Sequence, residues 1–261
     1  MYKITSLENP QVKQAASLKK RKYRQELEMF LIEGRRAAME AKRRPELIAS
    51  IFVEEQLAAD RDLLQDFEPT KTFATDKKII RHICSTEQPQ GIALVMHNPH
   101  WDWPQMLARR GVILLLDRIS DPGNMGSILR SAWALGIDGI MLGRECVDHL
   151  SPKVVRASMG AILNVPIFAD VTALHLEQLR QHGYLFMATD LDKGQDYDLL
   201  ALTAPLVLIF GNEAEGVSED LKQRCQAFIK IPMNPQVDSL NVAAACAIII
   251  AEIARQSRLR T

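Results

Sequence analysis

The chain has 261 residues, of which 47% are hydrophobic and 25% are charged. This composition is typical of a soluble globular protein, and the length suits one large domain or two ordinary ones. Lys plus Arg equals Asp plus Glu at 32 each, so the net charge indicates no partner, but residues 1–50 hold twelve bases and only six acids. We therefore expect the N-terminal part to contact a polyanion.

Metal binding, a disulfide framework and membrane attachment are not expected. The four cysteines have no CxxC spacing and no histidine pair nearby, which favours reduced thiols. The N-terminal MYKITSLENPQVKQ lacks the apolar centre of a signal peptide, and the run VAAACAIIIA has ten residues where a membrane helix needs about 20. We expect a cytoplasmic, soluble protein.

Helices and strands are predicted to alternate along residues 1–97, which indicates a small α/β domain. The first helix is basic, with Asn9 as its N-cap and Pro10 in its first turn. The expected elements are helix 9–26, strand 29–34, helix 35–44, strand 47–54, helix 55–67, strand 71–75, helix 76–84 and strand 91–97. Residues 98–110, with two prolines and two tryptophans, are expected to form a linker.

Alternation resumes in residues 111–261, where the strand 112–119 is apolar on both sides and so is expected to be parallel and central. The expected elements after it are helix 124–135, strand 139–143, helix 151–162, strand 165–168, helix 172–183, strands 184–190 and 205–211, helix 218–225, strand 228–233 and helix 241–256. The last helix is apolar around most of its circumference and is expected to be buried in the fold or in a dimer interface.

Three segments of this second domain each consist of an apolar strand and a turn of small and polar residues. They are LLLDRISDPGNMGSILR, LVLIFGNEAEGVSE and IKIPMNPQVDSLNVAAA. The carboxyl ends of parallel strands form the ligand site of an open α/β sheet, so the three turns are expected to converge on one pocket. Taken alone, each segment could equally well be an ordinary turn, the start of a helix or a helix cap. Neither the dinucleotide-binding motif GxGxxG nor a Walker loop is present.

In combination and in this order, the three segments resemble the SpoU (TrmH-like) family of RNA 2′-O-ribose methyltransferases, part of the SPOUT superfamily. The matching residues are Asn124, Gly126 and Arg130 in the first, Gly211, Glu213 and Gly216 in the second, and Ile231–Met233 with Ser239–Val242 in the third. The stretch KVVRASMGAILNVPI is also similar to the family, and the resemblance covers residues 111–256. The N-terminal domain resembles the small α/β/α sandwich, akin to RNA-binding ribosomal proteins, that precedes the catalytic domain in ribosomal-RNA members.

The resemblance implies an α/β fold with a deep trefoil knot near the C-terminus, a homodimer, and S-adenosyl-L-methionine bound by the knot loops. It implies methyl transfer to a ribose 2′-hydroxyl of RNA, and 23S ribosomal RNA is the expected substrate. A transfer-RNA substrate and a methyltransferase that confers antibiotic resistance are alternatives in the same class. A non-catalytic RNA-binding or assembly factor and a nucleotide-dependent oxidoreductase are alternatives from other classes. The sequence does not indicate the target nucleotide.

Residue roles follow from the resemblance together with side-chain chemistry. Adenine recognition suits backbone groups in tight loops, and the residues assigned to the cofactor are Thr189, Gly211, Ile231, Met233 and Leu240. Those assigned to catalysis are Asn124, Arg130, Glu213, Ser239 and Asn241. A guanidinium is effectively always protonated, so Arg130 is expected to grip the phosphate beside the target ribose rather than to act as a base. A surface ion pair for Arg130, a helix charge for Glu213 and a simple cap for Asn241 are the alternatives.

Basic side chains of the first helix and of the start of the next are expected to contact RNA phosphates. They are Lys13, Lys19, Lys20, Arg21, Lys22, Arg24, Arg35 and Arg36. The alternative for such a run is a solvated helix face.

Overall fold

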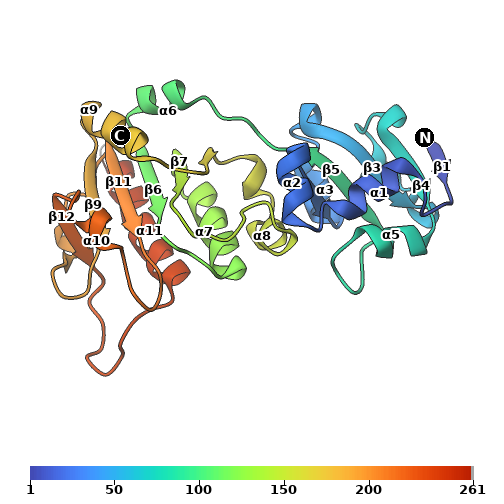
Figure 1. Cartoon of the computed structure of the whole chain (residues 1–261). Helices are drawn as coiled ribbons and strands as arrows, with labels where there is room; N and C mark the ends of the chain where they lie inside the picture. The colour runs from blue at the N-terminus through green and yellow to red at the C-terminus, as the bar shows by residue number, and fades with distance from the viewer. Residues whose placement is uncertain (260–261) are drawn as a thin grey trace. The chain divides into compact units, whose positions relative to one another are not determined.

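The computed structural model describes residues 1–259, which divide into two compact units (Figure 1). Unit 1 comprises Met1–His100 and Asp148–Leu163, and unit 2 comprises Trp101–Val147 and the chain from Asn164 onward. The segment 148–163, expected in the second domain, therefore makes its contacts within unit 1. Residues 103–109 of the expected linker form a helix of unit 2.

Unit 1 is a mixed five-stranded sheet with helices packed against it. In spatial order its strands are β1 (Tyr2–Ile4), β4 (Thr72–Thr75), β3 (Ile48–Glu54), β5 (Ile92–His97) and β2 (Met29–Glu33), with β2 and β3 antiparallel to β5 and the other pairs parallel. Its helices are α1 (Pro10–Ser17), α2 (Arg21–Leu27), α3 (Arg35–Ala41), α4 (Arg61–Leu64), α5 (Lys77–Ile83) and α8 (Pro152–Ser158). Short 3₁₀ turns occupy Pro45–Leu47, Glu55–Leu57, Pro69–Lys71 and Ala161–Leu163.

Apolar side chains explain this packing. Val12 and Ala15 of α1 and Ile79, Ile80 and Ile83 of α5 lie in one cluster with Leu31, Phe52 and Val95 of the sheet. Helices α3 and α8 contact β2. The neighbours of these strand residues along the chain, such as Ile51 and Leu94, are also buried, so both faces of the central strands are covered.

Two helices of unit 1 differ from expectation. Asn9 caps α1 as predicted, its side chain accepting from the Gln11 N–H, but the helix ends at Ser17. Lys20 is extended, with φ −97° and ψ 132°, before α2 starts. The expected helix 55–67 is reduced to a 3₁₀ turn and the single turn α4. Leu18 is fully buried at the break between α1 and α2, so packing against the sheet has overridden helix propensity there.

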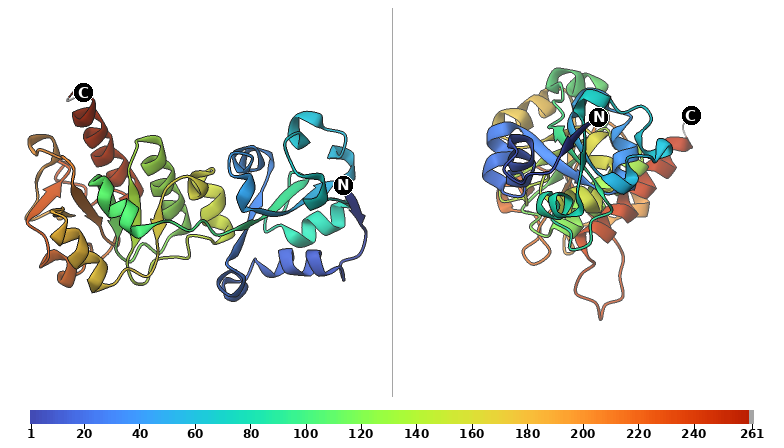
Figure 2. Two further views of the ribbon diagram at one scale, coloured as in Figure 1. Left: turned by 90° about the horizontal axis from the view of Figure 1, so that it is seen from above. Right: turned by 90° about the vertical axis from the view of Figure 1, so that its right-hand side faces the viewer.

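Unit 2 is a seven-stranded sheet in which every neighbouring pair is parallel, as expected. The spatial order is β10 (Gln195–Asp196), β12 (Ala227–Lys230), β9 (Leu185–Thr189), β11 (Leu206–Phe210), β6 (Val112–Leu116), β7 (Gly139–Leu142) and β8 (Ile167–Phe168). Helices α6 (Trp103–Arg109), α9 (Ala173–Gln181) and α10 (Glu219–Lys222) pack with one face of the sheet, and a 3₁₀ turn covers Tyr197–Leu199. Helices α7 (Pro122–Ala134) and α11 (Val242–Arg258) contact each other, and Figure 2 shows α11 and α9 on opposite sides of the sheet.

The strand order places the functional loops at one edge. β6, β9, β11 and β12 are adjacent and parallel, so the loops after Leu116, Thr189, Phe210 and Lys230 leave the same edge of the sheet. The trefoil knot stays a prediction. The last helix is only partly buried: Cys246 and Ile250 face the core, whereas Ile248 keeps 37% of its surface exposed. None of the helices within residues 1–259 is long and apolar enough to span a membrane.

Candidate active site

A chain of side-chain hydrogen bonds joins the three motif loops at the carboxyl edge of the unit 2 sheet. The Asn241 side-chain amide donates to Oδ1 of Asn124 at 2.9 Å. The Asn124 side-chain amide in turn donates to the Glu213 carboxylate. Each residue comes from a different loop, so the sequence motifs converge as the fold class requires.

Two of the three residues in this chain, Asn124 and Asn241, are fixed by helix caps. Asp121 caps α7, and its carboxylate accepts the Asn124 backbone N–H at 2.8 Å. Asn241 caps α11, and its side-chain oxygen accepts the N–H groups of Ala243 and Ala244 at 3.0 and 3.2 Å. Asn241 is therefore a cap and a link at once, because its oxygen serves the helix while its amide donates to Asn124.

Arg130 lies on the exposed side of α7, six residues after Asn124 and so about 9 Å farther along the helix axis. Within residues 1–259 it forms no hydrogen bond or ion pair with another side chain. The surface ion pair considered as an alternative is thus not found in this part of the chain. The guanidinium is free to contact a ligand, although it neither lines the pocket described below nor joins the Asn124 chain.

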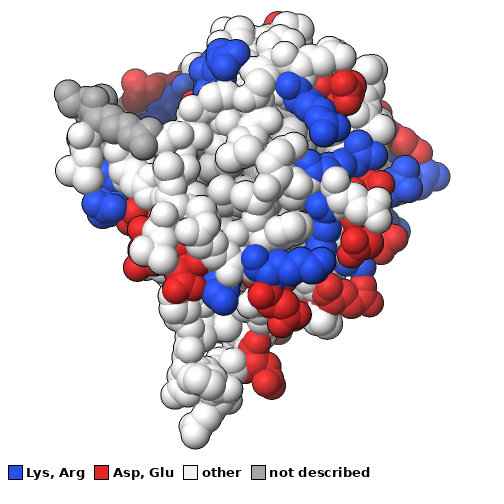
Figure 3. All heavy atoms as spheres, turned by 90° about the vertical axis from the view of Figure 1, so that its left-hand side faces the viewer, with Lys and Arg blue, Asp and Glu red and all other residues white. Residues whose placement is uncertain are grey.

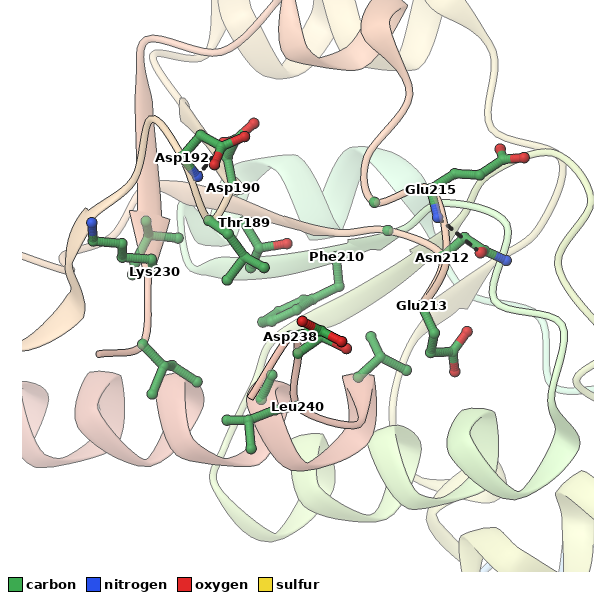
Figure 4. Close-up of a pocket in the computed structure, with 18 of the residues that line it drawn as sticks. Thr189, Asp190, Asp192, Phe210, Asn212, Glu213, Glu215, Lys230, Asp238 and Leu240 are labelled. Atoms are coloured by element: carbon green, nitrogen blue, oxygen red, sulfur yellow. Dashed lines mark hydrogen bonds between the residues drawn. The ribbon is translucent and has the colours of Figure 1, made fainter. Parts of the chain in front are cut away.

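A pocket of about 460 Å³ opens beside these loops (Figure 4). All five residues expected to hold the cofactor line it: Thr189, Gly211, Ile231, Met233 and Leu240. Glu213 and Ser239 also line it, whereas Asn124 and Asn241 do not. Figure 4 shows Thr189 and Lys230 on one side, Glu213 on the other, and Asp238 and Leu240 between them above α11. The volume is in the range of small-molecule and cofactor sites.

The loop after β11 folds back on itself so tightly that only glycine fits at its start. A Cβ on Gly211 would lie 2.1 Å from the carbonyl carbon of Gly216, which is a backbone atom that cannot rotate away. Gly216 has φ +67°, and its N–H donates to the Asn212 carbonyl at 2.8 Å. The two positions of the motif therefore require glycine for different reasons. Gly211 lies too close to the backbone of Gly216 for a side chain, and Gly216 has a left-handed conformation.

Asp117 and Arg118, directly after β6, were not singled out from the sequence, yet both hold this loop. The buried Asp117 carboxylate accepts the Ser218 N–H at 2.8 Å. The Arg118 guanidinium donates to the Gly216 carbonyl at 3.2 Å and also to the Glu215 carboxylate. An Asp-Arg pair at the end of a strand is the only sequence signal for them, and it is too common to identify a site.

Asp190 fixes the second wall of the pocket. Its side chain accepts the N–H groups of Asp192 and Lys193 at 3.0 and 2.9 Å and pairs with Lys222 at 2.6 Å. Burial raises the pKa of the Asp190 carboxyl, but the hydrogen bonds from Lys193 and Lys222 outweigh it, so this pKa lies below its usual value. Asp190 is therefore ionised at neutral pH and holds the turn 190–194.

The pocket is acidic. Two lysines and five carboxylates line it, the lysines being Lys222 and Lys230 and the acids Asp190, Asp192, Glu213, Glu215 and Asp238. The wall thus carries more negative than positive charge, which favours a cationic ligand. No group of histidine, cysteine or carboxylate side chains within residues 1–259 could hold a metal ion.

The basic residues expected to bind RNA lie in unit 1 and differ in how free they are. Lys20, Arg21 and Arg36 are exposed and form no ion pair within the described chain. The others are engaged: Lys13 pairs with Glu8, Lys22 with Glu26 and Arg35 with Asp60, and the Lys19 ammonium donates to the His82 carbonyl. The face drawn in Figure 3 belongs to unit 2, and on it basic and acidic side chains are intermixed.

Arg24 is a correction to the expected RNA-binding set. Its side chain is buried, its Nε and Nη2 donate to Asp148 Oδ2 at 3.0 and 2.5 Å, and its Nη1 donates to the Leu18 carbonyl at 2.7 Å. A guanidinium that is buried against these partners is not accessible to a phosphate of RNA. Arg24 therefore anchors the segment 148–163 within unit 1 instead of contacting RNA.

Comparisons with known proteins agree with the motifs. Residues 111–251 match the SpoU rRNA Methylase family, and residues 9–94 match the MRM3-like substrate binding domain. The chain is 30% identical over 250 residues to the 23S rRNA (guanosine(2553)-2′-O)-methyltransferase RlmP of Bacillus subtilis, covering 96% of this chain and 98% of that protein. It is 33% identical to an uncharacterised tRNA/rRNA methyltransferase of Synechocystis, covering 97% and 93%.

Solved structures with bound cofactor are similar over the whole chain. An AdoMet-bound rRNA methyltransferase from Sinorhizobium meliloti superposes with a TM-score of 0.83 at 30% identity, covering 98% of this chain and 97% of that one. The SpoU methyltransferase AviRb from Streptomyces viridochromogenes, in complex with AdoMet, gives a TM-score of 0.85 at 27% identity, covering 96% and 99%. The similarity therefore includes both units.

Proposed function

Because the chain belongs to the SpoU rRNA methylase family and is an S-adenosylmethionine-dependent RNA methyltransferase, we propose that it methylates a ribose 2′-hydroxyl of 23S ribosomal RNA. The observation that carries this proposal is the hydrogen-bonded chain Asn241–Asn124–Glu213 beside a pocket lined by all five expected cofactor residues. The 23S substrate is supported by a relative of that activity that matches nearly the whole chain, including the N-terminal unit.

The volume and the charge of the pocket suit S-adenosylmethionine. When bound, this cofactor supplies a methyl group on a positively charged sulfur, and the leaving group departs as a neutral thioether. The backbone around Gly211, Ile231, Met233 and Leu240 offers N–H and carbonyl groups to an adenine, and the surplus carboxylates suit a cation. Thr189 has its hydroxyl bonded to the Ile209 carbonyl at 3.3 Å, so it shapes the wall.

Catalysis by this chain is positioning together with removal of one proton. Arg130, which is exposed and without a partner in residues 1–259, grips the phosphate next to the target ribose and thereby orients the 2′-hydroxyl. Arg130 has no acceptor atom and cannot be the base, so the proton of the 2′-hydroxyl passes to that phosphate. Asn124 holds the side chains of Glu213 and Asn241 in place by hydrogen bonds. The exposed Ser239 faces the substrate from the rim of the pocket.

We further infer a homodimer. Along α11, Ala244, Ile248 and Ala251 form an exposed stripe of small and apolar residues at helical spacing. Helix α11 contacts α7, the helix that carries Arg130, so a second copy on this stripe would lie against the neighbour of the helix that bears the catalytic arginine. The Ile248→Glu variant is expected to sediment as a monomer and to lose methyl transfer. A monomeric variant of full activity would contradict the dimer requirement.

Because the proposed substrate is ribosomal RNA, we also infer that the protein acts in the cytoplasm.

The test of the function is a map of ribose methylation. Total RNA from cells with and without the gene is compared for 2′-O-methylation at every nucleotide, and the missing site is then restored in vitro with purified protein and a 23S fragment. Loss of a mark in transfer RNA, with 23S unchanged, would replace the substrate but keep the enzyme class. No change in any RNA would contradict methyl transfer to ribose.

A further inference from the structure

We propose that Arg118 is a positioning residue that holds the loop 211–217 in the form that binds the cofactor. Arg118 does not line the pocket, so it acts through the loop, six of whose residues, 211 to 216, do line it. The proposal rests on the proposed function only in using S-adenosylmethionine as the ligand.

The backbone of Arg118 is already unusual. Its φ is +58°, a left-handed conformation that non-glycine residues adopt uncommonly, and it follows directly on the buried strand β6. In this conformation its carbonyl accepts the Asn212 side-chain amide at 3.2 Å. The Asn212 side-chain oxygen accepts the Ala214 N–H at 2.8 Å, so the first turn of the loop is tied to Arg118.

The side chain of Arg118 ties the other end of the loop. Its Nη2 donates to the Gly216 carbonyl at 3.2 Å, its Nη1 donates to Glu215, and its Nε lies 3.6 Å from Asp117 Oδ2. That same Asp117 oxygen accepts the Ser218 N–H. Arg118 is three-quarters buried, so these contacts are partly shielded from water and from salt.

These contacts matter for residues 213–216, which do not pack in the core as the buried Val217 does. Glu215 is largely exposed, and Gly216 has no side chain with which to pack. A loop that must be ordered before the ligand binds lowers the apparent affinity by the fraction of molecules in the competent form. Arg118 thus raises cofactor affinity by keeping Gly211 and Glu213 in place before binding.

The test replaces the side chain while keeping the left-handed backbone. Arg118→Asn and Arg118→Gly both tolerate φ +58°, so neither introduces backbone strain. We expect each to raise the Kd for S-adenosylmethionine about tenfold by calorimetry, with a parallel rise in KM and with kcat at saturating cofactor within about twofold of wild type. Arg118→Lys, which retains one donor group, is expected to recover part of the affinity.

Two control variants separate the loop contact from charge alone. Glu215→Gln removes the exposed partner of Arg118 together with one of the five carboxylates of the pocket wall, and it is expected to change the Kd less than about threefold, since exposed ion pairs contribute little. Arg109→Ala removes an exposed arginine of α6 and is expected to change nothing. A wild-type Kd in both Arg118→Asn and Arg118→Gly would overturn the proposal, as would a loss of kcat at saturating cofactor with KM unchanged. A wild type that binds the cofactor but methylates no RNA would refute the proposed function without touching this result.

Discussion

Asn241 donates its side-chain amide to the side-chain oxygen of Asn124 at 2.9 Å, across 117 positions of sequence. Asn124 passes the contact on to Glu213 with its own amide, so one residue of the first motif holds a residue of each of the others. Each asparagine also caps its helix or sits in its first turn, which limits the orientations available to it. The arrangement makes Asn124 the centre of the site.

Replacing either asparagine is expected to remove the hydrogen bond between Asn241 and Asn124. Asn124→Ala and Asn241→Ala should each lower kcat by about 5- to 100-fold, the range that a lost hydrogen bond with an unpaired partner implies. The combined loss in the double variant should be smaller than the product of the two single losses, because both variants remove the bond between Asn241 and Asn124. Single-turnover methylation of a 23S fragment measures this, and fully additive losses would show that the two residues act separately.

Arg130 is expected to act on the RNA and not on the cofactor. Arg130→Ala should keep the Kd for S-adenosylmethionine and lower kcat by about 100-fold or more, the cost of removing one preorganised donor from a charged transition state. Arg130→Lys should recover only part of this, since a lysine cannot form two parallel bonds to a phosphate. Normal methylation by Arg130→Ala would assign the residue to the protein surface.

The spacing of apolar residues predicted most of the helices and strands. It failed where contacts with residues far away in the sequence determine the local structure. The all-parallel sheet of unit 2 and the Asn9 cap are confirmed by the structure. The break between α1 and α2 was missed because it depends on burying Leu18 and on pairing Arg24 with Asp148, 124 positions away. Arg24 lies within a run of basic residues, and nothing in the neighbouring sequence indicates that it pairs with a distant carboxylate.

Site residues divide in the same way. Gly211 was found because it matches the motif Gly-x-Glu-x-x-Gly of the family that the chain resembles, and the close backbone approach that requires glycine lies within that motif. Arg118 was missed because its role depends on a left-handed conformation that arginine does not favour and on a loop almost 100 residues later. Local chemistry is therefore readable from the sequence, whereas support from a distant segment is not.

Gly211→Ala is expected to abolish cofactor binding. The added Cβ would lie 2.1 Å from the Gly216 carbonyl carbon, so the loop must open. Gly136→Ala is a matched control, because a Cβ there meets nothing within 4 Å, although its φ of +73° still costs about 1 kcal/mol of stability. Calorimetry should show no heat of binding for the first variant and a wild-type Kd for the second. Retained binding by Gly211→Ala would mean that the loop is not held in this form.

Arg24 and the free basic residues of unit 1 should differ in what they control. Arg24→Ala leaves the largely buried Asp148 carboxylate without its cationic partner, so the free energy of unfolding should fall by about 3–5 kcal/mol. The Lys20→Ala, Arg21→Ala double variant should leave stability unchanged and reduce the slope of log affinity for RNA against log salt by about 1 to 2. Denaturant unfolding and RNA binding at several salt concentrations test the pair, and the reverse pattern would restore Arg24 to the RNA surface.

The acidic pocket is expected to favour the cofactor over its product. S-adenosylmethionine carries one more positive charge than S-adenosylhomocysteine, and the carboxylates of the pocket wall outnumber its lysines. Raising the salt concentration should therefore weaken binding of the cofactor more than binding of the product. Asp238→Asn should raise the cofactor's Kd about 2- to 5-fold with a smaller effect on the product, whereas Asp198→Asn, an exposed acid outside the pocket, should change neither. Competition calorimetry measures both ligands, and an equal shift for the two would show that Asp238 acts through shape and not through charge.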